Sequence, residues 1–130
     1  MGDKAPTEVP TIVVVSRGAQ VIVREVLAGI EEEGVPCSLC DTAAEASVVA
    51  VGAVALAYSA AGRSRLEVGV AVGTGGLVCV HHVKRPATDP IVVEEVGEDL
   101  PTARRLGHNA ARVVVGVALK PDLPAGVVSR

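Results

Sequence analysis

Three consecutive carboxylates, Glu31 to Glu33, are the residues of this sequence best suited to chemistry. They lie in the segment VREVLAGIEEEGVP (23–36), whose apolar residues recur at helical spacing: Val23, Val26, Leu27 and Ile30. Gly34 can take the left-handed conformation that ends many helices, and Pro36 would prevent continuation. The carboxylates therefore fall where a helix carries partial negative charge and basic residues are usual. They are either a solvated charge run or ligands for something positive outside the helix, such as a cation or a basic partner surface.

Cysteine and histidine, the other common metal ligands, are poorly spaced for a joint site. Cys37 and Cys40 form a C-x-x-C pattern, but on a strand their side chains would point to opposite faces, and zinc needs further ligands. His81 and His82 are neighbours on a predicted strand, so we expect one to be packed and the other exposed. Since His108 lies on a separate element, the roles of the three histidines and the three cysteines stay open.

No pattern in the sequence predicts a catalytic site. The spacing indicates no Ser-His-Asp or Cys-His pair, in which a nucleophile needs a base within hydrogen-bond reach. The segment SRGAQ (16–20) has one glycine where a dinucleotide-binding loop needs three. The glycines of GTGG (73–76) precede a strand rather than a helix, so they indicate a tight turn and not a phosphate loop. We therefore expect a protein that is not itself an enzyme.

Composition narrows the function further. A chain of 130 residues makes a single domain, in which we expect 1–10 and 120–130 to be loose tails. A net charge of −3, with one Tyr and no Phe or Trp, argues against nucleic-acid binding, because phosphates and bases would both lack partners. The polar, proline-containing start predicts no secretory signal, and the odd cysteine count fits reduced thiols in the cytoplasm.

Hydrophobic patterning predicts five strands and three helices. The strands are expected over 11–16, 36–41, 68–73, 77–82 and 91–96, and the helices over 19–33, 43–62 and within 97–116. Helices between the earlier strands imply right-handed crossovers, and the glycine turn makes one strand antiparallel. We expect an α/β fold of three layers, α/β/α, with a mixed five-stranded sheet, strand order 2-1-3-4-5 and the fourth strand antiparallel.

Two of these helices carry further signals. Residues 46–62 have no charge, but the run is too short and too rich in alanine and glycine for a membrane span, so we expect it inside the protein or against a partner subunit. Thr42 and Glu45 form the capping box that would open this helix. In the third helix, Thr102 or Asn109 is the expected N-cap, and the expected apolar stripe is Ala110, Val113, Val114 and Val117.

Four segments occur in order over most of the chain: REVLAGIEEEGVP (24–36), similar to G-I-E-E-E-G-[IV]-P; SRLEVGV (64–70), similar to S-x-L-x-V-G-I; Val80-His81 with PATDP (86–90), similar to V-H…P-A-x-x-P; and GHNAAR (107–112) with Gly116, similar to G-N-N-A-A-R-x-x-x-G. Together they resemble one family, the small subunits of coenzyme B12-dependent diol and glycerol dehydratase reactivases. The resemblance implies a non-catalytic small subunit of an ATP-dependent chaperone that releases damaged cobalamin from an inactivated dehydratase.

The same resemblance implies partners and a metal ligand. A large subunit would carry the nucleotide site and the ATPase, two large and two small subunits would form a heterotetramer, and this complex would bind the dehydratase transiently. The middle glutamate, Glu32, would bind a Mg²⁺ ion shared with the large subunit, and this chain alone would bind no cobalamin. Mg²⁺ takes hard oxygen ligands and only one or two carboxylates from a protein, which suits Glu32. Glu31 and Glu33 would be solvated, or they would help to orient Glu32 without binding the ion themselves.

The sequence also departs from the family pattern. His108 replaces the family's first Asn, Cys37 replaces an aromatic residue, and VGVA (115–118) replaces a K-G-I-P pattern, so details of the partner surface differ. His81 and Asn109 would either line an interface or make local hydrogen bonds.

Two alternative functions stay open at this point. One is a small or medium subunit of the B12-dependent dehydratase itself. The other is a flavodoxin-like small-molecule-binding module, whose ligand would lie beyond the carboxyl ends of the strands. The sequence leaves open whether the dehydratase acts on a diol or on glycerol. It also leaves open whether the isolated chain self-associates through an uncovered apolar face.

Overall fold

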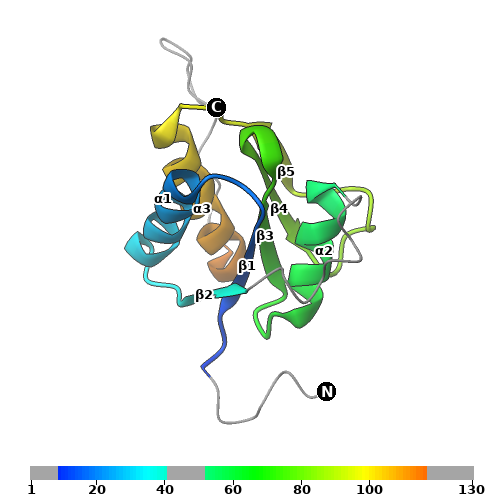
Figure 1. The fold of residues 1–130 in the computed structure, drawn as a ribbon. Helices are drawn as coiled ribbons and strands as arrows, with labels where there is room; N and C mark the ends of the chain where they lie inside the picture. The colour runs from blue at the N-terminus through cyan, green and yellow to red at the C-terminus, as the bar shows by residue number, and fades with distance from the viewer. Residues whose placement is uncertain (1–8, 41–51, 117–130) are drawn as a thin grey trace, which may run out of the picture.

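The computed structural model describes residues 9–40 and 52–116, and its elements follow the predicted order (Figure 1). They are β1 (Ile12–Ser16), α1 (Gln20–Glu32), β2 (Cys37–Cys40), α2 (Ala53–Arg63), β3 (Val68–Val72), the short 3-10 turn η2 (Thr74–Gly76), β4 (Leu77–His82), β5 (Val92–Glu95) and α3 (Leu100–Val115). The expected tails lie largely outside the described residues, so the single-domain assignment stays a prediction.

The five strands form one mixed sheet in the order β2-β1-β3-β4-β5. Strand β1 is parallel to both β2 and β3, whereas β4 is antiparallel to both β3 and β5. The predicted strand order and the antiparallel fourth strand are therefore confirmed. Strand β3 is buried along its whole length, because helices cover both faces of the sheet at its centre, and this explains its uninterrupted apolar sequence.

Helices α1 and α3 cover one face of the sheet and α2 covers the other (Figure 1). The core is correspondingly divided in two. Val14, Val70 and Val80 pack with the buried faces of α1 and α3, whereas Val15 and Cys79 pack with α2. The sheet thus separates two apolar clusters, as expected for a three-layer domain.

Helix α2 packs through small side chains. Its buried residues are Ala53, Leu56, Ala57, Ala60 and Ala61, and a side chain on Gly69 of β3 would collide with the α2 backbone at Ala57 and Ala61. Helix α2 therefore packs on the sheet through one face, with Ser59 and Gly62 exposed on the other. The helix begins at Ala53, because Gly52 is an N-cap with extended backbone, so the prediction of one helix over 43–62 is wrong at its start. The predicted capping residues Thr42 and Glu45 lie outside the described residues. Across 9–40 and 52–116, no helix is long and apolar enough to cross a membrane.

Helix α3 begins earlier than either predicted cap. Asp99 is the N-cap, because its carboxylate accepts hydrogen bonds from the Thr102 backbone N–H at 3.2 Å and from Thr102 Oγ1 at 2.7 Å. The Thr102 and Asn109 predictions are therefore wrong: Thr102 is inside the first turn, and Asn109 is buried in mid-helix. The apolar face begins about two turns before the predicted stripe, with Ala103 and Leu106. Val113 and Val114 are only partly buried, and Val117 lies outside the described residues.

Helices α1 and α3 approach so closely that their backbones touch. A side chain on Gly107 would collide with the Val26 carbonyl oxygen, and one on Gly29 would collide with the Arg104 carbonyl oxygen. Both glycines are buried at the contact between the helices. Glycine is needed here for the absence of a side chain rather than for its backbone freedom, and this contact sets how α3 lies across α1.

We predict that Gly107→Ala destabilises the protein by about 1–3 kcal/mol, because the added methyl group must push the two helix backbones apart. Urea unfolding monitored by circular dichroism measures this change. Gly62→Ala is the matched control, since a Cβ there meets nothing within 4 Å. The control is expected to raise stability by up to about 1 kcal/mol, as alanine replaces glycine in an exposed helix position. Equal effects of the two substitutions would contradict the close helix contact.

We also predict that Asp99→Ala lowers the thermal unfolding temperature at pH 7 by removing the N-cap of α3. The Thr102 hydroxyl and backbone N–H, which donate to the Asp99 carboxylate, hold the pKa of Asp99 below its usual value. This stabilisation is present above the unfolded-state pKa and is lost as pH falls through the lower folded-state pKa. The difference between Asp99→Ala and the parent chain should therefore shrink in acid, and a constant difference down to pH 2 would argue against the cap.

Candidate functional site

The three carboxylates lie at the end of α1, as the sequence predicts. Glu32 is the last helical residue, Glu33 is the C-cap, and Gly34 has a φ of 83°. The Glu33 and Gly34 backbone N–H groups donate to Ile30 O at 3.1 Å and Glu31 O at 2.9 Å, which closes the last turn. Glu31 and Glu32 are exposed, whereas Glu33 is half-buried.

Basic residues of α3 contact this end of α1. Arg104 Nη1 donates to Glu32 Oε2 at 2.7 Å, and His108 Nε2 lies 2.6 Å from Glu32 Oε1. One turn further along α3, Arg112 Nη2 lies 3.4 Å from Glu33 Oε2. The positive charge that the helix end requires thus comes partly from within the chain. The solvated-run interpretation is wrong for Glu32 and Glu33, which both have partners, and Glu31 is exposed as expected.

Arg104 extends the same network to Glu25, two turns back along α1. Its Nε donates to Glu25 Oε1 at 2.8 Å. We call Glu25, Glu32, Glu33, Arg104, His108 and Arg112 the α1–α3 charge cluster. The sequence alone predicts neither this cluster nor the role of His108. The available signal was the spacing of Arg104, His108 and Arg112, which lie four residues apart and share one face of a helix.

The charge cluster keeps Glu32 ionised at neutral pH. The hydrogen bond with His108, together with the positive charge of Arg104, holds the pKa of the Glu32 carboxyl below its usual value. The pKa of Arg104 is raised, mainly by its hydrogen bond to Glu25. Glu25, Glu32, Glu33 and the adjacent exposed Glu31 are four carboxylates, and they outnumber the two guanidinium groups together with His108. The end of α1 therefore carries net negative charge whether or not His108 is protonated.

Glu32 can be one ligand of a metal ion but not its whole site. A carboxylate has about four lone-pair positions, and the described contacts use one on each oxygen. Among the described residues, no group of three or more His, Cys, Asp or Glu side chains is placed to hold a metal ion. A hard cation bound at Glu32 would therefore take its other ligands from water or from a second chain, which is typical of Mg²⁺.

The cysteines and the other histidines have structural surroundings. Cys37 packs in the apolar core on the face of the sheet covered by α1 and α3, whereas Cys40 packs in the apolar core on the face covered by α2. The predicted opposite orientation of the two side chains is therefore confirmed. His81 is fully buried, with Nε2 3.0 Å from Ala87 O and Nδ1 accepting from the His82 N–H at 3.0 Å. His82 is partly exposed, so the expected contrast between a packed and a more exposed neighbour holds for this pair. Local hydrogen bonds therefore account for His81.

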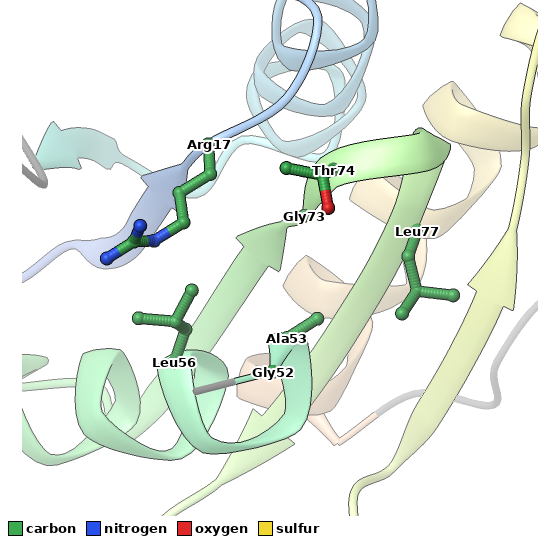
Figure 2. A pocket seen from close by; sticks show the side chains of 7 residues that line it. All are labelled: Arg17, Gly52, Ala53, Leu56, Gly73, Thr74 and Leu77. Atoms are coloured by element: carbon green, nitrogen blue, oxygen red, sulfur yellow. The ribbon is translucent and has the colours of Figure 1, made fainter. Parts of the chain in front are cut away.

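A separate cavity of about 350 Å³ lies at the carboxyl ends of β1 and β3 (Figure 2). Its lining is formed by Arg17, Gly52, Ala53, Leu56, Gly73, Thr74 and Leu77. The connections that leave β1 and β3 run in opposite directions along the sheet, towards β2 and β4, and such a switch point is the usual ligand position of open α/β folds. The adjacent Gly75 and Gly76 have φ values of 73° and 80°, which agrees with the predicted turn. Glu32 lies near the other end of the strands, their amino ends, because α1 runs back from the end of β1 to the start of the parallel strand β2.

Comparison with known protein families and chains gives consistent matches. Residues 9–120 match the family model described as dehydratase medium subunit. The chain is 39% identical over 97 residues to the diol dehydratase-reactivating factor small subunit of Klebsiella michiganensis, covering 75% of this chain and 72% of that protein. It is 40% identical over 101 residues to the propanediol dehydratase-reactivating factor small subunit of Salmonella typhimurium, covering 78% and 80%.

Solved structures give the same result. A glycerol dehydratase reactivase chain superposes with a TM-score of 0.76 at 29% identity, covering 87% of this chain and 98% of that one. A chain of the diol dehydratase-reactivating factor complexed with ADP and Mg²⁺ superposes with a TM-score of 0.74 at 35% identity, covering 88% and 100%. The similarity thus spans almost the whole length of these structural relatives.

We predict that Cys79 resists thiol reagents in the folded protein. Burial raises the pKa of Cys79 to about 12. Roughly one Cys79 thiol in ten thousand would then be ionised at pH 8, and the thiolate is the reactive form. Labelling with iodoacetamide followed by peptide mass spectrometry should modify Cys79 only after denaturation. Labelling of Cys79 in the folded chain as fast as that of the partly exposed Cys40 would contradict this packing.

Proposed function

The chain belongs to the dehydratase medium-subunit family, among the small subunits of dehydratase-reactivating factors, and from this premise we propose its cellular role. It acts as the non-catalytic small subunit of an ATP-dependent chaperone that releases damaged cobalamin from a diol or glycerol dehydratase. The observation that carries the proposal is the similarity to reactivating-factor small subunits over 72% and 80% of their length, and to solved reactivase chains over 98% and 100% of theirs. The name small subunit implies a larger partner, to which we assign the nucleotide site and the ATPase.

We further propose that Glu32 binds a Mg²⁺ ion shared with that large subunit. Four observations support this assignment: the Glu32 carboxyl has a lowered pKa, its side chain is 47% exposed, the cluster together with Glu31 carries net negative charge, and a related reactivating factor is known in complex with ADP and Mg²⁺. Glu32 would supply one carboxylate oxygen, and the ion would screen negative charge between the two chains. This chain alone would bind no cobalamin.

The proposed assembly is a heterotetramer of two large and two small subunits that binds the dehydratase transiently. Exposed apolar side chains support a role for surfaces covered by other chains, since Leu39 on the edge strand β2 is 51% exposed and Val115 at the end of α3 is 58% exposed. Without its partner, the chain would be prone to self-association through such residues.

A second candidate is a medium subunit of the dehydratase itself, which is favoured by the description of the matching family model. In that case the purified chain would associate with dehydratase activity stably rather than transiently. The two candidates are separated by whether a tagged chain co-purifies with a large ATPase subunit or with the dehydratase.

We predict that the chain and a reactivase large subunit from the same organism elute together in size-exclusion chromatography when Mg²⁺ is present. The assembled complex should restore activity to a dehydratase inactivated by damaged cobalamin, and only when ATP, Mg²⁺ and intact cobalamin are added. Independent elution of the two chains at every Mg²⁺ concentration would count decisively against the proposal.

Glu32→Gln should weaken the Mg²⁺-dependent association and leave the circular dichroism spectrum of the isolated chain unchanged. The substitution keeps the shape of the side chain but removes the negative charge that a hard cation requires. Glu31→Gln is the matched control, because it removes a neighbouring exposed carboxylate. Equal association of Glu32→Gln and the parent chain would remove Glu32 as the ligand.

A further inference from the structure

Arg104 joins two carboxylates of α1 that lie two helical turns apart. Its Nε donates to Glu25 Oε1 at 2.8 Å and its Nη1 donates to Glu32 Oε2 at 2.7 Å. Glu25 and Glu32 are seven residues apart and therefore lie on the same side of α1. One guanidinium group thus links the end of α1 to the middle of the same helix.

The close contact between the helices makes this double contact possible. Gly29 lies between Glu25 and Glu32 along α1, and a side chain there would collide with the α3 backbone at Arg104. Because glycine removes that obstacle, Arg104 starts close to the surface of α1, and its planar fork reaches a carboxylate on either side. Lysine has no such fork, since its ammonium group is a single point charge.

The contacts fix the orientation of Glu32. A glutamate at a helix end has several rotatable bonds, and binding a cation normally requires ordering them. Here Arg104 holds one oxygen and His108 holds the other at 2.6 Å. The remaining lone pairs are therefore held in position before any cation arrives. The positive charge of Arg104 is already shared with Glu25, which limits its repulsion of a cation at Glu32.

We propose that Arg104 is a positioning residue, which uses Glu25 as an anchor to hold the Glu32 carboxylate in the orientation that binds the divalent cation. This inference rests on the proposed function, because it assumes that Glu32 is the ligand. Neither Arg104 nor Glu25 needs to touch the cation or the partner chain. Groups that orient metal ligands typically change metal affinity 10- to 100-fold when they are removed.

The test measures how much Mg²⁺ is needed for half-maximal association of the full chain with the large subunit, by biolayer interferometry. Arg104→Lys keeps the charge and loses the fork, whereas Glu25→Gln replaces the charged anchor with a weaker, neutral acceptor without altering Arg104 or Glu32. Each is expected to raise the half-maximal Mg²⁺ concentration roughly 10-fold. The double variant should show no larger change than either single one, because both act through the same contact.

Two controls separate positioning from general stability. Arg105→Lys changes the next residue of α3, which pairs with Glu94 at 3.1 Å instead, and should leave the Mg²⁺ requirement unchanged. At saturating Mg²⁺ the Arg104→Lys and Glu25→Gln variants should bind the large subunit as tightly as the parent chain. A purely structural role would instead weaken binding at every Mg²⁺ concentration, and that result would overturn the inference.

The outcomes also distinguish this inference from the proposed function. If Glu32→Gln changes the Mg²⁺ requirement but Arg104→Lys and Glu25→Gln do not, the positioning role is wrong and the ligand assignment stands. A lower Mg²⁺ requirement in Arg104→Lys would identify Arg104 as a competitor of the cation and would also overturn the inference. If Glu32→Gln has no effect, the ligand assignment fails and the inference fails with it.

Discussion

The backbone contact between α1 and α3 is the constraint on which the charge cluster depends. Two buried glycines, Gly29 and Gly107, let the helices approach until main-chain atoms meet. A larger residue at either position would separate the helices and would move the basic face of α3 away from the acidic end of α1. The ion pairs and the lowered pKa of Glu32 therefore depend on the close packing of α1 and α3 at these glycines. Substitutions at the two glycines would therefore disturb the charge cluster on the surface as well as lower the stability of the fold.

The charge cluster also resolves a conflict that is visible in α1 by itself. Acidic residues at a helix C-terminus oppose the helix dipole, and α1 has no basic residue in its last turn. Helix α3 provides the missing positive charge through Arg104, His108 and Arg112, yet these groups remain outnumbered when Glu31 is counted with the carboxylates of the cluster. The negative charge that remains at the end of α1 favours a positively charged partner.

The sequence predicts most of the fold and only part of the site. Apolar runs and glycine turns identify the sheet, because burial on both faces leaves a direct mark on strands such as β3. The end of α1 at Gly34 is likewise a local signal. The pairing of Arg104 with Glu25 and Glu32 is not local, since 79 and 72 residues separate the partners. Periodicity shows which side chains share a helix face, but it does not show which helices cross. The α3 cap was missed for a related reason: Asp99 and Thr102 both favour helix starts, and only geometry shows which one accepts.

The ring contact between the partly exposed Tyr58 and the buried His81 has a consequence for spectroscopy. The two ring centroids lie 5.0 Å apart, and they link α2 to β4. Tyr58 is the only Phe, Tyr or Trp in the chain. Near-ultraviolet absorption of the isolated protein therefore reports the environment of one side chain, Tyr58, where α2 packs on the sheet. In any mixture with another protein, tryptophan emission would come entirely from the other protein, so association could be followed from one side without labelling.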